Sequence, residues 1–197
     1  MKNLLIILIA TAATLPALAQ KATFKKHYLN QTEVGVMLGR VKADPYAGQG
    51  GRGQEISQNR TNLTLQTLNG IQFTPRLGMG VITGLDWYNA ALVNPVGAGL
   101  RYDLAGKSTA RLYASADAGY GFTWFHDDAE GFDTKGGLML NPGLGLRIGK
   151  PDGAAFTLAF SYKHQNVTVE KPPFWDQSTR TEERNYNRFL VRLGVAF

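Results

Sequence analysis

The chain has 197 residues, a formal net charge of +6 and no cysteine. Without cysteine it can form no disulfide framework and offers neither a thiol nucleophile nor a thiolate metal site. Its basic residues are scattered along the sequence, whereas a nucleic-acid interface needs a basic patch or stripe, so nucleic acid is not an expected partner. The length is that of one domain.

The first residues have the three parts of a signal peptide: a basic Lys2, the apolar run LLIILIA, and the small-x-small sequence ALA before Gln20. The apolar run is too short to span a membrane as a helix, and no later segment has about 18 uninterrupted apolar residues. If the mature chain lies in a membrane, it does not cross with helices. We therefore expect an exported protein with three parts: a cleaved signal peptide (1–19), a periplasmic lead (20–30) and one folded domain (31–197).

Apolar and small or polar residues alternate through most of the remaining sequence. In RLGMGVITGLDWYN, residues 76–89, most apolar side chains share one parity, and the glycines share the other with Ile82, Asp86 and Tyr88. Successive side chains of a strand point to opposite faces, so this alternation predicts strands whose two faces meet different surroundings. Eight strands are expected, at residues 31–41, 60–73, 76–88, 95–104, 110–125, 137–149, 154–166 and 186–197.

A soluble β-sandwich and a membrane β-barrel both show such alternation. On a solvent-facing strand surface we would expect Thr, Lys and Glu rather than glycine. Here the less apolar face is rich in glycine and other small residues with a few charges, which suits the narrow interior of an eight-stranded barrel. This composition favours an all-β, eight-stranded antiparallel up-and-down transmembrane β-barrel.

The connections between the expected strands alternate in length, as in outer-membrane barrels. Three are short turns, at residues 74–75, 105–109 and 150–153. The others include the long ones and are expected to be extracellular loops, at about residues 42–59, 89–94, 126–136 and 167–185. Pro142 lies inside an expected strand, and because a closed barrel has no free edge for a proline, we expect a β-bulge there.

Aromatic residues gather near the ends of the expected strands. Membrane barrels carry such residues as two interfacial girdles, whereas the aromatic core of a sandwich need not sort to strand ends. We interpret seven residues as girdle members: Phe73, Trp87, Tyr88, Tyr102, Trp124, Phe125 and Phe156.

The sequence ends on RFLVRLGVAF, residues 188–197, with a regular apolar face and a terminal aromatic. Open sheet edges are not tolerated in lipid, so the last strand must pair with the first. We expect this pairing to involve the segment from Glu33 to Val41, with Phe197 at the periplasmic interface.

With these features the chain resembles the small eight-stranded outer-membrane β-barrel proteins, the OmpA/OmpX-like group, and more narrowly the "outer membrane protein beta-barrel domain" proteins common in Bacteroidetes. The resemblance covers the chain from about residue 31. It rests on the segments NGIQFTPRLGMGVITGLDWY (69–88), LRYDL (100–104), ADAGYGFTW (116–124), LNPGLGLRI (140–148) and RLGVAF (192–197).

This resemblance implies a location in the bacterial outer membrane, among lipid and lipopolysaccharide, and insertion by the barrel-assembly machinery. It also implies that the alternating C-terminal residues are the signal that this machinery reads, here Val191, Leu193, Val195 and Phe197.

Eight charged residues have inward parity, and an isolated buried charge is costly, so opposite charges should pair. We expect Asp86 to lie beside Arg101, and Asp117 near Arg147. The set is interpreted as a network that fills the lumen, with a narrow ion pathway as the alternative: Asp86, Arg101, Asp103, Asp117, Arg147, Lys163, Arg188 and Arg192.

Catalytic patterns are weak. The acids that follow His126, in the loop at 126–133, fit a solvated surface segment better than a cation site. Ser161 and His164 have opposite parity, which disfavours a serine-hydrolase pair of the kind that a lipid A-modifying barrel would need. We expect a non-enzymatic protein without a cofactor or metal. Its role is structural or is surface interaction through the extracellular loops with a protein or other ligand. An ion or small-solute pore and a lipid A-modifying enzyme are the alternatives.

Overall fold

A computed structural model describes residues 24–47, 56–89, 91–107, 109–150, 153–172 and 180–197. The predicted signal peptide lies outside these residues. The described chain forms nine strands: β1 (His27–Ala47), β2 (Ile56–Gln72), β3 (Leu77–Tyr88), β4 (Ala91–Lys107), β5 (Ala110–Phe122), β6 (Asp133–Lys135), β7 (Gly137–Gly149), β8 (Ala155–Lys171) and β9 (Arg180–Ala196).

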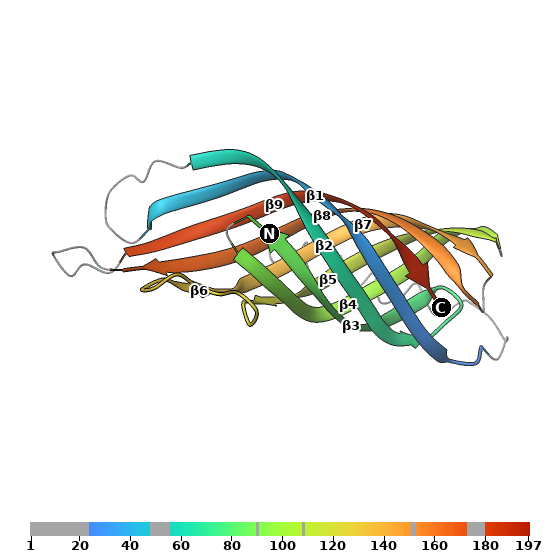
Figure 1. The fold of residues 1–197 in the computed structure, drawn as a ribbon. Coiled ribbons are helices and arrows are strands. Elements are labelled where there is room, and N and C mark those ends of the chain that lie inside the picture. Colours follow the sequence, from blue (N-terminus) through green and yellow to red (C-terminus); the bar gives the residue numbers. More distant parts are fainter. Residues whose placement is uncertain (1–23, 48–55, 90, 108, 151–152, 173–179) are drawn as a thin grey trace, which may run out of the picture.

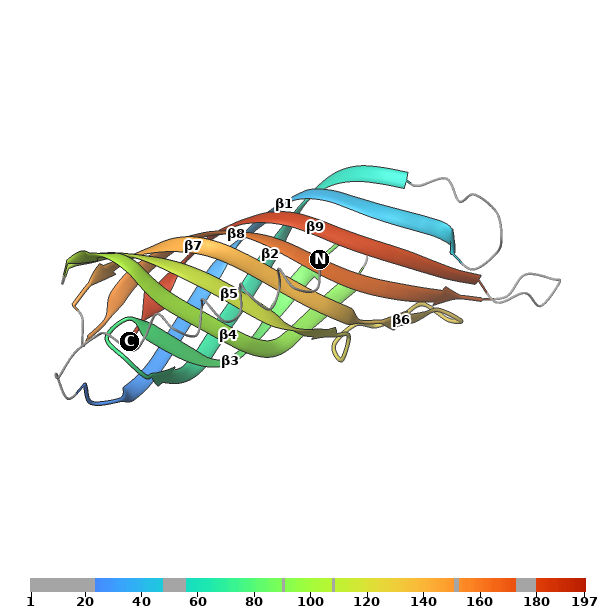
Figure 2. The same ribbon diagram turned by 180° about the vertical axis from the view of Figure 1, so that it is seen from behind.

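The strands form one closed sheet. Its order is β6-β8-β7-β5-β4-β3-β2-β1-β9, and a further β8–β9 pairing joins the two ends. The short β6 continues the line of β7 along β8, because Asp133 pairs with Glu170 and Met139 pairs with Gln165. The barrel wall therefore has eight antiparallel positions, and the predicted fold class is confirmed. Figures 1 and 2 show the tilted strands from opposite sides.

The barrel wall begins and finishes on the same side of the membrane. The start of β1 and the end of β9 meet there (right in Figure 1), together with the short turns that follow β2, β4 and β7. Short turns mark the periplasmic end of an outer-membrane barrel and longer loops the extracellular end. We name the two ends accordingly. Among the described residues, no helix is long and apolar enough to cross a membrane.

The two faces of the barrel wall have the reverse of the polarity found in a water-soluble protein. The outer face is apolar, and the inner face is polar and charged. Outward side chains such as Val34, Val81 and Leu193 are about 60% exposed, whereas inward ones such as Glu33 and Gln66 are 2% exposed. Burying charges while exposing large apolar side chains would be unfavourable in water. It is the arrangement expected when the outside of a barrel faces lipid.

Five strands, β1, β2, β4, β8 and β9, are longer than predicted, mainly at the extracellular end, whereas β3 and β5 are shorter and β7 matches its prediction. Residues 42–47 continue β1, residues 167–171 continue β8, and residues 180–185 begin β9. The expected loop at 89–94 is wrong, because residues 91–94 belong to β4. Where a strand extends beyond the lipid, both of its faces can be polar. Its sequence then lacks the alternation of apolar and polar residues from which the strands were predicted.

The expected β-bulge at Pro142 is wrong. The β7–β8 register continues without a shift from Leu140↔His164 to Gly143↔Ser161, although the two pairs between them are missing from the ladder. Proline lacks the N–H that one of these bonds needs, and losing it does not require an extra residue. Pro95 leaves a similar gap between β3 and β4 without changing the register.

The last strand closes the barrel against the expected segment of the first strand. Glu33 pairs with Gly194, and Val41 pairs with Tyr186, so the predicted partner segment of the C-terminal strand is confirmed. The amide of Asn30 donates to the carbonyl of Phe197 at 2.7 Å, and the amide of Phe197 donates to the carbonyl of Asn30 at 3.0 Å. The final residue therefore belongs to the seam rather than to a frayed end.

We predict that deleting Phe197 reduces assembly more than a substitution in an exposed loop, such as Asp127→Asn. The deletion removes two seam hydrogen bonds and the aromatic end of the predicted assembly signal. Heat-modifiable gel mobility and protease protection in whole cells measure assembly. Phe197→Ala keeps the backbone bonds and separates the two contributions. Normal mobility and protection of the deletion variant would refute the prediction.

Candidate functional site in the barrel lumen

The eight charged residues predicted to point inward are all buried in the lumen, none of them more than 6% exposed: Asp86, Arg101, Asp103, Asp117, Arg147, Lys163, Arg188 and Arg192. Their positions follow from strand alternation, which fixes the face of every second residue once one face meets lipid. Eight strands leave an interior just wide enough for side chains, so these groups must contact one another.

One ion pair crosses the full width of the lumen. Lys163 on β8 donates to Asp86 on β3, and both side chains are fully buried. Four steps around the wall separate these two strands, in either direction, so they stand on opposite sides of the barrel. Thr64 Oγ1 donates to the other oxygen of Asp86 at 2.7 Å. Opposite walls of the barrel are therefore linked directly by side chains.

A second group converges on Asp117 of β5. Arg101 Nη1 on β4 lies 2.6 Å from Asp117 Oδ1. Gln66 of β2 and Asn141 of β7 donate their amide protons to Asp117 Oδ2 at 2.9 and 3.0 Å. Three donors from three strands thus satisfy one buried carboxylate, which is the condition for keeping such a charge inside a protein.

A third group surrounds Glu33 of β1, which the sequence interpretation missed. Gln31 Nε2 donates to Glu33 Oε1 at 2.7 Å and to Tyr113 Oη at 2.9 Å. Tyr113 on β5, the opposite wall, donates to Glu33 Oε1 at 3.3 Å, and Arg192 Nε lies 3.4 Å from Glu33 Oε2. Glu33 alternates with the outward Val34, so its parity was a usable signal that it points inward.

A glycine makes room for Tyr113 in this group. A Cβ atom built on Gly145 of the neighbouring β7 would overlap the Tyr113 ring. The small residues on the inward face therefore have a packing role: they allow a few large side chains to cross a narrow lumen. Composition indicated this role in general terms, but not which large residue each glycine accommodates.

In both predicted ion pairs, the partner assigned to the aspartate is wrong. Asp86 pairs with Lys163 rather than Arg101, and Asp117 pairs with Arg101 rather than Arg147. The prediction joined residues from strands that are close in sequence. Closure of the barrel instead places β8 opposite β3. In the β4–β5 register, Asp117 pairs with Gly99, so Arg101 lies two residues along the neighbouring strand.

Tyr88 does not belong to an outer aromatic girdle. It points inward, is 6% exposed and stacks on Tyr186 with 4.1 Å between ring centroids. The Arg188 guanidinium lies 5.5 and 5.9 Å from the Tyr186 and Tyr88 ring centroids, a distance suited to cation–π contact. Tyr88 directly follows the outward Trp87, so strand alternation turns its side chain inward. Its position at the strand end, on which the girdle interpretation rested, did not determine its direction. These rings contribute to an apolar cluster inside the extracellular half: Met37, Tyr88, Ala91, Val93, Val167, Val169, Tyr186 and Leu190.

The remaining residues interpreted as girdle members face outward or lie beyond a strand end. Trp87, Tyr102, Trp124, Phe125 and Phe156 are between 40% and 74% exposed, and Phe73 is half-buried at the periplasmic end. Trp124 and Phe125 follow the end of β5 rather than lying within it. Three residues of the predicted assembly signal, Leu193, Val195 and Phe197, are exposed on the outer face, and Val191 is half-buried.

The acidic loop is organised by hydrogen bonds within itself. The amide of Thr134 donates to Asp128 Oδ2 at 2.9 Å, and His126 Nε2 lies 3.4 Å from Asp128 Oδ1. Slight burial raises the pKa of Asp128, but the Thr134 hydrogen bonds and His126 outweigh it and hold the pKa below its ordinary value. Within the described ranges, no group of three or more His, Cys, Asp or Glu residues could hold a metal ion.

Ser161 and His164 do not form a catalytic pair. Ser161 is buried inside the barrel, whereas His164 is half-buried on the other face, with its Nδ1 2.8 Å from Asn187 Oδ1. A nucleophilic serine needs a base within hydrogen-bonding reach.

No protein-family model matches the sequence, and no curated protein matches it. Among solved structures, the chain is similar to the crystal structure of the outer membrane protein OprG from Pseudomonas aeruginosa, with a TM-score of 0.60 and 16% identity over 86% of this chain and 93% of that chain. The solid-state NMR structure of the outer membrane protein AlkL in lipid bilayers gives a TM-score of 0.50 and 15% identity, over 91% of this chain and 93% of that chain.

At these identities the likeness concerns the fold, which is that of small outer-membrane β-barrels. The resemblance expected from the sequence is confirmed at this level. The fold, the apolar outer surface and the charged interior together define an integral protein of the bacterial outer membrane. Barrels of this class stand in lipid and lipopolysaccharide and are inserted by the barrel-assembly machinery.

We predict that Asp86→Ala lowers the free energy of unfolding by about 3–5 kcal/mol, because it leaves the Lys163 ammonium buried and unpaired. Urea titration of the barrel in phospholipid vesicles measures this value. The double variant Asp86→Leu/Lys163→Met removes both charges and should recover most of the loss. As a control, Glu170→Ala removes an exposed partner of Lys135 and should cause no measurable change. A single variant as stable as the parent would contradict the assigned pair.

Proposed function

We propose that the protein is a non-enzymatic outer-membrane barrel with a closed lumen, which acts as a structural element or through contacts made at its extracellular end. The observation that carries the proposal is the pair of links between opposite walls: Asp86 with Lys163, and Glu33 with Tyr113. A lumen crossed twice by buried, bonded side chains is better suited to holding the wall together than to conducting.

The energetics of these links favour a plug over a pathway. Passage of an ion would require the Asp86–Lys163 pair to separate inside a lumen with no room for bulk water. Separating a buried pair leaves two uncompensated charges, which is costly. Above the pair, the buried Tyr88, Val93 and Leu190 add an apolar layer that an ion would also have to cross.

The extracellular end supplies the surface for a partner. The extracellular ends of β1, β2, β8 and β9 extend beyond the barrel body (left in Figure 1). Trp124 and Phe125, which follow the extracellular end of β5, are 64% and 67% exposed, and aromatic residues are common anchors at binding surfaces. We propose a protein or other surface ligand as the partner of this end. Parts of the predicted loops, at residues 48–55 and 173–179, lie outside the described residues.

We predict no reproducible open steps for the purified barrel in planar lipid bilayers, because bonded side chains join opposite walls across its lumen. The recording is single-channel current at several voltages, with an established porin as the positive control. Asp86→Ala/Lys163→Ala empties the middle of the lumen and should raise the frequency of conducting events. Regular open steps from the unaltered protein would support the pore alternative and sink the closed-lumen proposal.

We also predict that lipid A from cells producing the protein has the same mass spectrum as lipid A from cells without it, since Ser161 and His164 are on opposite faces. A new lipid A mass would favour the enzymatic alternative. His164→Ala provides the control: a modification that disappears in this variant would assign the chemistry to that histidine.

A further inference from the structure

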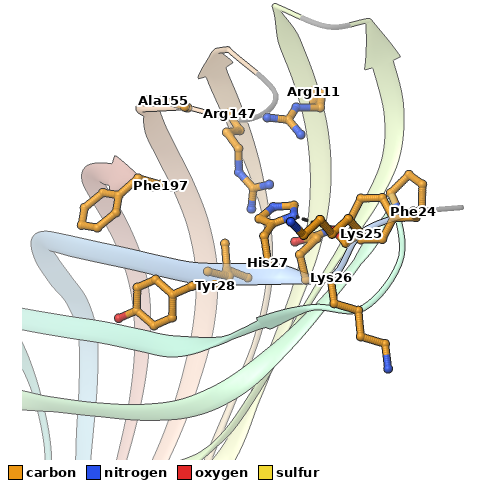
Figure 3. Close-up of a pocket in the computed structure, with 14 residues that line it drawn as sticks. Phe24, Lys25, Lys26, His27, Tyr28, Arg111, Arg147, Ala155 and Phe197 are labelled. Carbon is orange, nitrogen blue, oxygen red and sulfur yellow. Dashed lines mark hydrogen bonds between the residues drawn. The ribbon is translucent and has the colours of Figure 1, made fainter.

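A cavity of about 720 Å³ opens at the periplasmic end of the lumen. Figure 3 shows its position between the start of β1 and the periplasmic ends of β5 and β7. Five basic residues line it: Lys25, Lys26, His27, Arg111 and Arg147. Among the described residues that line the cavity, none is acidic. Its volume is in the range of pockets that hold small molecules.

Arg147 is the central group of this cavity. It is 5% exposed, yet its Nε and Nη2 atoms have no hydrogen-bond partner among the described residues. Its Nη1 lies 3.7 Å from Asp103 Oδ1, which is too long for a hydrogen bond. A buried guanidinium with several unused donors is costly unless another group accepts from it.

Asp103 cannot neutralise this end of the lumen alone. It also lies 3.5 Å from Arg111 Nη1, so one carboxylate is shared between two guanidinium groups. The Arg111 Nε is likewise buried without a partner. Arg147 and His27 both line the cavity, which Figure 3 shows in close-up. The Arg147 guanidinium also lies over the Tyr113 ring, 5.2 Å from its centroid. The side chains that line the cavity therefore give it a positive charge.

We propose that this mouth is a binding site for an oxyanion, the carboxylate or phosphate of a small molecule, held by Arg147 and Arg111. The planar guanidinium presents parallel N–H donors that match two oxygens of either group. Leu29, Ala155 and Ala196 provide apolar wall beside these donors, so the site suits an anion with an apolar substituent. The site is separate from the extracellular surface proposed above, and it does not require the lumen to conduct.

The test uses the refolded full-length mature chain in octyl glucoside, a detergent without phosphate. Inorganic phosphate, phenyl phosphate and benzoate are titrated against the isotope-labelled barrel, and amide chemical shifts are followed by NMR. We expect saturable shifts at Gln72, Ala155 and Ala196, with phenyl phosphate binding more tightly than inorganic phosphate. The absence of saturable shifts at these residues for all three probes would overturn the proposal.

Variants separate a built site from general positive charge. Arg147→Gln should weaken phenyl phosphate binding about tenfold or more, because it removes a charged donor pair. Arg147→Lys keeps the charge without the planar fork and should weaken binding less. Arg76→Gln makes the same charge change on an exposed residue at the same end of the barrel and should leave binding within about twofold. Equal losses in Arg147→Gln and Arg76→Gln would overturn the proposal.

Heat-modifiable mobility confirms that each variant is folded. If Arg147→Gln does not fold, Arg111→Gln is used, with the same expected loss. Repeating the titration in nanodiscs with phosphatidylglycerol identifies the source of the anion. Weakened phenyl phosphate binding there, relative to neutral nanodiscs, would assign the site to a lipid headgroup. Unchanged binding would assign it to a soluble anion.

Discussion

The pairing of β1 with β9 is the interaction on which the rest of the structure depends. In lipid every backbone donor and acceptor needs a partner, and a sheet with two free edges would leave a row of them unmet on each side. Closure removes both edges, and the bonds between Asn30 and Phe197 carry the seam to the last residue. Closure also creates the lumen, so the surroundings of every inward side chain depend on this pairing.

Once the sheet is closed, the interior is constrained by size as much as by charge. Eight strands leave room for side chains only, and each charged group must find its partner across or beside it within that space. Asp86 reaches Lys163 on the opposite wall, and Glu33 reaches Tyr113. The periplasmic mouth departs from this pattern, because Arg111 and Arg147 share one distant carboxylate. Arg101, Arg188 and Arg192 also keep buried donors without a partner, but Arg111 and Arg147 are the arginines that line the periplasmic cavity.

Much of the architecture could be predicted from alternation because lipid makes the two faces of each strand differ strongly. The eight barrel positions, the inward charges and the segment that pairs with the last strand came from parity and from the need to close the sheet. Parity also pointed to Glu33 and Tyr88 as inward residues, but the first was overlooked and the second was assigned by its place at a strand end. Beyond the lipid the contrast between faces fades, and there the strand ends were misjudged.

By itself, the sequence determined the class of structure and the face on which each strand residue lies, because a two-residue period is a local property of the chain. Which residues meet inside was decided only by the tertiary structure. The partner of Asp86 lies 77 positions away, and its choice depends on strand order, register and closure together. The same holds for the basic mouth, since residues at the start of β1 and the turn-side ends of β5 and β7 become neighbours only when the sheet closes.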